Sequence, residues 1–168
     1  MLPDIEIGNL EADEVILLYD WIRSIASPPA TAILYSIRDD ENYPLLTFDR
    51  PVERLFAGEI EPFHHLLGPI MADGVQLPAL AIYIGDEDGI LFDYRVGSEW
   101  TEETLFAFVK FLCVIASKTR APEIYDSGLI DTRSSSPRQG RVPLIERQEF
   151  AEMCRHFNDR TVSVRGAS

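Results

Sequence analysis

Residues 77–119, LPALAIYIGDEDGILFDYRVGSEWTEETLFAFVKFLCVIASKT, carry the strongest structural signal in the chain. Two short apolar runs, 79–85 and 90–96, flank the acidic turn Asp86-Glu87-Asp88-Gly89, which predicts a β-hairpin. A helix is predicted to follow, because Thr101 is a suitable N-cap residue and glutamates occupy the first turn. Its sequence is apolar almost all round, so we expect this helix, over about residues 101–119, to be largely buried.

The rest of the chain predicts a single α+β domain spanning residues 1–168. Strands that lie so close in sequence pair antiparallel, which argues against a Rossmann-type fold. We therefore expect an antiparallel sheet of about four to five strands, built from two hairpins and packed by three to four helices. The other predicted helices cover 10–26, 52–59 (after Pro51) and 146–158, with a helical turn at 63–67. The other predicted strands are an irregular arm or short edge strand around 5–7, a hairpin of 31–38 and 43–49, a short strand within 123–130, and a terminal strand or tail at 161–165. A tight turn is predicted at Asp73-Gly74 and a flexible loop at about 131–141.

Charge is the most informative global property of the chain. Its 28 acidic and 15 basic residues give a net charge of −13. Residues 1–112 hold 21 acids and 6 bases, whereas 113–168 hold 7 acids and 9 bases. Such a field repels nucleic acid and anionic membranes and attracts basic partners, although acidity also serves plain solubility. The acidic start of the chain lacks the features of a signal peptide, so we expect a cytoplasmic protein.

Residue patterns that indicate enzymatic chemistry are scarce. His64 and His65 are adjacent and match no metal-ligand spacing. Asp86-Glu87-Asp88 lacks the alternate spacing of a calcium loop and fits a solvated turn. Cys113 and Cys154 lie on apolar faces of predicted helices, where reduced, buried thiols are expected. We therefore expect no catalytic residue, metal or cofactor.

The segment from Asp93 to Trp100 is the densest cluster of functional residue types. Asp93 and Arg95 share one face of the predicted strand, and Glu99 and Trp100 lie just before the buried helix. A structural ion pair beside a core aromatic residue is the simplest interpretation. A second interpretation makes Tyr94, Arg95 and Trp100 anchors of a recognition surface, because tyrosine, tryptophan and arginine are enriched in such surfaces.

In general character, rather than by any motif, this small acidic α+β domain resembles bacterial immunity proteins. The leading hypothesis is therefore a non-enzymatic protein that neutralises a basic toxin or effector by direct binding. Complementary charge would speed the encounter of the two proteins. The expected partner-binding residues lie in the two acidic turns and before the buried helix: Asp39, Asp40, Glu41, Asp86, Glu87, Asp88, Arg95, Glu99 and Trp100.

Two other functions stay open at this point. The first is a small enzyme or ligand-binding domain whose site combines Asp93, Arg95, His64 and His65. The second is an acidic surface that mimics DNA and inhibits a nucleic-acid-binding protein, although the acids follow no regular period in the sequence. The serine- and arginine-rich segment 131–141 lacks apolar residues, which favours a mobile loop.

Overall fold

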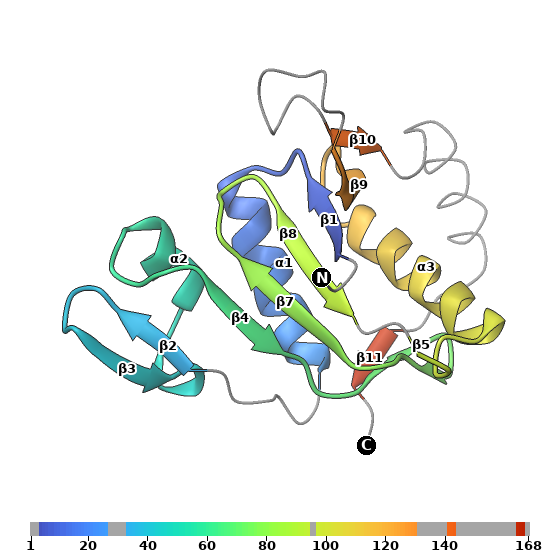
Figure 1. Cartoon of the computed structure of the whole chain (residues 1–168), viewed down its shortest axis with the longest axis horizontal. Helices are drawn as coiled ribbons and strands as arrows, with labels where there is room; N and C mark the ends of the chain where they lie inside the picture. Colours follow the sequence, from blue (N-terminus) through green and yellow to red (C-terminus); the bar gives the residue numbers. More distant parts are fainter. Residues whose placement is uncertain (1–3, 27–32, 95–96, 131–140, 144–163, 167–168) are drawn as a thin grey trace.

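The computed structural model describes residues 4–26, 33–94, 97–130, 141–143 and 164–166 (Figure 1). Its centre is an antiparallel sheet in which five strands follow the order β9-β1-β8-β7-β4, and short β10 extends the β9 edge with an irregular register. The predicted α+β class is therefore confirmed. The strands of this sheet are β1 (Asp4–Gly8), β4 (Phe63–Leu66), β7 (Leu80–Ile84), β8 (Ile90–Tyr94), β9 (Glu123–Ile130) and β10 (Arg141–Pro143).

The hairpin predicted over residues 79–96 is confirmed as β7 and β8. The two strands pair antiparallel with Ile82 opposite Phe92. Both of these side chains are fully buried, as are Ile84 and Ile90. Every second residue of each strand therefore faces the core, which is the period expected of a strand with one buried face.

Two helices cover one face of the sheet, which we call the inner face. α1 (Ala12–Ile25) lies behind the strands in Figure 1, and α3 (Glu102–Ala116) lies beside them. The Phe111 ring of α3 packs on Trp21 of α1 and on Phe92 of β8, with centroid separations of 6.2 and 5.8 Å. The hydrophobic core therefore lies between the inner face and these two helices.

α3 begins as predicted and is buried over most of its length. Thr101 accepts a hydrogen bond from the backbone N–H of Thr104 at 3.3 Å, which confirms it as the N-cap residue. Residues 107–115 are buried or half-buried. Leu105 and Phe106 are 49% and 47% exposed, so the expectation of burial all round is wrong for the start of the helix. Among the described residues, no helix is long and apolar enough to cross a membrane.

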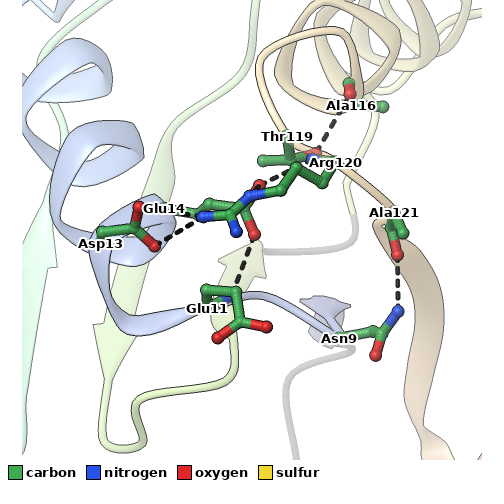
Figure 2. A network of polar contacts seen from close by, with 8 residues as sticks. All are labelled: Asn9, Glu11, Asp13, Glu14, Ala116, Thr119, Arg120 and Ala121. Atoms are coloured by element: carbon green, nitrogen blue, oxygen red, sulfur yellow. Dashed lines mark hydrogen bonds and ion pairs between the residues drawn. The ribbon is translucent and has the colours of Figure 1, made fainter.

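A polar network holds the start of α1 against the chain that follows α3 (Figure 2). The Arg120 guanidinium donates to both carboxylate oxygens of Asp13 at 2.9 Å, and its backbone N–H donates to Glu14 at 2.6 Å. Glu14 is 6% exposed and also completes the capping box of its own helix. The Asn9 amide donates to the Ala121 carbonyl at 2.7 Å. These contacts position α1 relative to α3 and β1.

β1 is a central strand that pairs with β8 on one side and with β9 on the other. The expectation for residues 5–7 is therefore right about a strand and wrong about an edge. Ile5 and Ile7 are buried in the core. Both partners of β1 are distant in the sequence, so no local pattern could indicate that a strand would form on each side of it.

The hairpin around residue 40 forms a separate sheet of β2 (Ile33–Ser36) and β3 (Glu41–Pro44). The prediction that both hairpins build one sheet is therefore wrong. β3 ends at Pro44, which has no N–H to continue a ladder. Leu45–Thr47 forms the 3-10 helix η1 in place of the strand predicted to residue 49. Leu45 is fully buried, so the chain turns inward at this point.

β4 replaces the helical turn that was predicted over residues 63–67. Phe63 and His65 are buried, whereas His64 and Leu66 are exposed. Burial thus alternates with the period of a strand, and pairing with β7 imposes this period. The prediction of a helical turn is wrong because the two adjacent histidines carry no apolar alternation in the sequence itself.

The remaining elements settle several smaller predictions. α2 (Pro51–Phe56) begins with proline, as predicted, but ends before residue 59. The tight turn Asp73-Gly74 has a positive φ at both residues and joins β5 (Ile70–Ala72) to β6 (Val75–Gln76). β11 (Val164–Gly166) pairs with β5 in a three-stranded sheet with β6. The loop predicted at about 131–141 lies outside the described residues except for Arg141, which begins β10. The predicted helix at 146–158 and Cys154 also lie outside them.

Candidate partner-binding surface

The two acidic turns that were predicted to bind a partner both lie on the left half of Figure 1, with α2 between them. β2 lies beside the chain that follows α2, because the Glu61 N–H donates to the Tyr35 carbonyl at 3.2 Å and the Arg38 N–H donates to the Glu59 carbonyl at 3.4 Å. α2 in turn faces the β7–β8 turn. We call this region the acidic end. Its carboxylates are Asp39, Asp40, Glu41, Glu59, Glu61, Asp86, Glu87 and Asp88.

A hollow of about 490 Å³ separates α2 from the β7–β8 turn. Leu55 and Phe56 line it on the α2 side, and Asp86, Glu87 and Asp88 line it on the other side. An apolar wall opposite carboxylates suits a lysine or arginine side chain, because the alkyl stem packs on the apolar surface while the charged head meets the acids. The hollow therefore has the chemistry of a site for a basic side chain.

The β7–β8 turn is anchored on β1. The Leu10 N–H donates to the Asp88 carbonyl at 3.1 Å. Gly89 lies so close to β1 that a Cβ atom there would meet Glu6 Oε1 and the Ile7 carbonyl oxygen at 3.1 Å each. A second hollow, of about 90 Å³, lies here and is lined in part by Glu6 and Asp88. Carboxylates on an anchored turn lose little conformational freedom when they bind a partner.

The carboxylates of the β2–β3 turn are also held in place. The Tyr35 hydroxyl donates to Asp40, and the Tyr43 hydroxyl donates to Glu41 at 3.0 Å. These hydrogen bonds raise the pKa of both tyrosines, because each hydroxyl proton is held by a carboxylate. The two acids therefore keep defined positions on an exposed turn.

The other predicted contacts lie at the opposite end of β8. Trp100 is half-buried and packs edge-on against Tyr94 and Phe108, at centroid separations of 5.1 and 5.4 Å. Glu99 is exposed. The length of β8 separates both residues from the acidic end, so the structure does not bring them together with the two turns. Arg95 lies outside the described residues.

His64 and His65 point to opposite faces of β4. On the outer face, away from α1 and α3, His64 Nδ1 lies 2.9 Å from Asp93 Oδ2, and its ring centroid lies 4.7 Å from that of Tyr83. On the inner face, the buried His65 Nδ1 lies 3.1 Å from the Tyr19 hydroxyl, and burial raises the pKa of Tyr19. Of the residues in the alternative ligand site, His64 and Asp93 therefore meet on the outer face, and His65 lies on the opposite face.

Sequence reasoning missed the contribution of α2 and of the segment after it. Leu55 and Phe56 form the apolar wall of the hollow, and the backbone of Glu59 and Glu61 bonds to the β2–β3 hairpin. The sequence signal was weak: Glu59 and Glu61 lie at and just after the end that was predicted for the helix over 52–59. No motif marks these residues, because their role depends on where β2 and β7 lie.

A wider hollow, of about 550 Å³, lies between α1 and the chain after η1. Asp20 and Arg23 of α1 line it, together with Asp49. Burial, followed by the nearby Glu53 carboxylate, raises the pKa of Asp20 above the usual value. Both charge signs line this hollow, so it offers no preference for a basic partner, whereas the charged residues that line the hollow beside α2 are all acidic.

Metal-binding geometry and similar proteins give no further assignment. Within the ranges that the structure describes, no group of three or more histidine, cysteine and acidic side chains is placed to hold a metal ion. Comparisons of the chain with protein-family models, with characterised proteins and with solved structures found no match. The site must therefore be interpreted from its own geometry and charge.

Proposed function

We propose that this chain is a non-enzymatic binding protein that neutralises a basic toxin or effector protein by direct contact. The observation that supports this proposal is the hollow between α2 and the β7–β8 turn, where three consecutive carboxylates lie opposite an apolar wall. The net charge of −13 has the sign that attracts a basic partner. An immunity protein that blocks a nuclease fits best, because a nuclease needs a basic surface for its own substrate.

In the proposed complex, a lysine or arginine of the partner enters the hollow between α2 and the β7–β8 turn. Its alkyl stem packs on Leu55 and Phe56, and its charged head meets Asp86 and Asp88. The surrounding acids speed the encounter, and the apolar contact lowers the dissociation rate. Binding of this kind occupies the basic surface of the partner, which excludes the partner's substrate without any chemical step.

The test begins with recovery of the partner from the native host at low salt, followed by kinetics with variants. The triple variant D86N/E87Q/D88N removes three charges from the acidic end and preserves side-chain size. We expect its association rate constant to fall about tenfold, within the range known for electrostatic steering, with a smaller change in the dissociation rate. Stopped-flow mixing measures both constants.

The matched control removes the same number of charges from the opposite end, in E99Q/E102Q/E103Q. All three glutamates are exposed, and the association rate should fall less than about threefold, because distant exposed charges are screened. This control also tests Glu99 as a predicted contact. Equal effects of the two triple variants would show that total charge, and not the acidic end, drives binding. Failure to recover any basic protein would contradict the proposal.

The 2.9 Å contact between His64 and Asp93 supports a second candidate, a ligand-binding or enzymatic site on the outer face. A carboxylate that orients an imidazole is an arrangement found in general-base catalysis. Small polar ligands can be screened by the thermal stabilisation that they give. A ligand whose effect is lost in His64→Gln, but kept in D86N/E87Q/D88N, would favour this candidate over the binding protein.

A further inference from the structure

The free edge of the central sheet is a feature that the proposed contacts at the turns do not use. β4 pairs with β7 on one side, and no other described strand pairs with it. The Leu67 N–H donates to the Leu80 carbonyl at 2.9 Å, so these two residues form a hydrogen-bonded pair. Because such pairs alternate along an antiparallel ladder, the N–H and C=O groups of His64 and Leu66 point away from β7.

The side chains of His64 and Leu66 at this edge are exposed, whereas those of Phe63 and His65 are buried. The His64 side chain is 62% exposed and Leu66 is 54% exposed. Edge strands are usually protected by lysine, proline or a β-bulge. The four residues of β4, Phe-His-His-Leu, contain none of these devices, and the strand is short. An extended backbone and an exposed leucine therefore lie next to each other at an edge with which no other described strand pairs.

This edge is continuous with the acidic end. Glu61 belongs to that end, is exposed, and lies two residues before β4. Side chains of a strand alternate between two faces. A strand added along β4 would therefore carry apolar side chains on the face of Leu66 and basic side chains on the other face, and it would run along the edge that Glu61 precedes.

We propose that an extended segment of the basic partner adds to β4 as a further strand of the central sheet. Backbone hydrogen bonds to His64 and Leu66 hold it, and alternating apolar and basic side chains give it specificity. The identity of this partner rests on the proposed function. A second copy of this chain is a poor occupant, because each copy brings a net charge of −13 and the same acidic end to the contact.

The first part of the test uses a capped peptide of alternating lysine and valine as the probe, because valine favours a strand and lysine supplies the charge. Amide hydrogen exchange is followed residue by residue at low salt. We expect the peptide to slow exchange of the His64 and Leu66 amides about tenfold or more. The His65 amide points toward β7 and should be protected with or without the peptide, which provides a control within the same strand.

The second part of the test compares two substitutions at one position. Leu66→Pro removes the outward N–H and leaves the hydrogen bonds to β7 in place, since proline is tolerated at a free edge. Leu66→Ala removes most of the side chain and keeps the N–H. We expect Leu66→Pro to weaken peptide binding about tenfold and Leu66→Ala to weaken it no more than about threefold. Unchanged exchange at His65 shows that the strand is intact in both variants.

The outcomes separate this inference from the proposed function. The inference is wrong if the peptide does not bind, if it protects only the turn residues 86–88, if Leu66→Pro binds like the unaltered chain, or if sedimentation shows that a second copy covers the edge. Protection at His64 and Leu66 without recovery of a basic protein from the host would support the strand site and reject the proposed function. Partner binding that is lost in D86N/E87Q/D88N but kept in Leu66→Pro would support the proposed function and reject the strand site.

Discussion

His64 reaches Asp93 because a short side chain stands between them. His64 lies opposite Tyr83 on β7, and Ala81, the next residue on the same face, lies opposite Asp93 on β8. The imidazole therefore crosses β7 over the alanine methyl group to meet the carboxylate at 2.9 Å. A larger residue at position 81 would fill this path. One small side chain thus decides whether the histidine and the aspartate meet.

Asp20 gives a prediction about stability and pH. Burial, followed by the Glu53 carboxylate, raises its pKa in the folded chain above the value in the unfolded chain. A raised carboxyl pKa means that the unfolded state loses its proton first, so this residue destabilises the fold once the pH rises through the folded pKa. Asp20→Asn should therefore stabilise the protein at pH 7, by at most about 0.5 kcal/mol because solvent screens this site.

The measurement is thermal unfolding of both proteins at neutral pH and near pH 3. The gain in melting temperature should disappear in acid, where Asp20 itself is protonated. Glu103→Gln is the matched control, because it removes one charge from an exposed position on α3. If Asp20→Asn lowers stability at pH 7, then the attraction of Asp20 to Arg23 and Arg50 outweighs burial, and the direction of the shift is wrong.

Secondary-structure elements with a strong internal pattern could be predicted from the sequence, and others could not. β7, β8 and α3 carry their own alternation, helical periodicity and cap, so neighbouring residues were enough to define them. β4 has two adjacent histidines and takes its alternation from the pairing with β7. η1 forms because Pro44 ends a ladder and Leu45 turns to the core. These two elements are defined by tertiary contacts rather than by local pattern.

The candidate surface follows the same division. The acidic turns at 39–41 and 86–88 were predicted as turns from their composition alone. Their positions on either side of α2 depend on the pairing of Ser36 with Ile60 and on the packing around the hollow beside α2, and both join segments far apart in the sequence. The separation of Trp100 from these turns has the same origin, because the length of β8 lies between them. The number of charges follows from the sequence alone, whereas the positions of the acids on the surface depend on the fold.

At the scale of the whole molecule, the net charge of −13 sets a long-range field and the acidic end gives it direction. In the proposed complex, this field draws a partner with a basic surface toward the molecule, and the hollow beside α2 and the edge of β4 supply the short-range contacts. Long-range attraction therefore depends on the net charge, and short-range contact depends on the hollow and the strand edge. Salt weakens the long-range attraction and leaves the short-range contacts nearly unchanged.

This separation predicts the salt dependence of binding. Raising the ionic strength from about 0.01 M to about 0.15 M shortens the screening length from about 30 Å to about 8 Å. The association rate constant should fall about tenfold or more over this range, while the dissociation rate constant changes little, because contacts within the hollow exclude solvent. D86N/E87Q/D88N should show a shallower dependence than the unaltered chain, and E99Q/E102Q/E103Q should not. Stopped-flow kinetics at graded salt measures these slopes. An association rate constant that does not change with salt would mean that apolar contact controls the encounter. The acidic end would then have no part in attracting the partner.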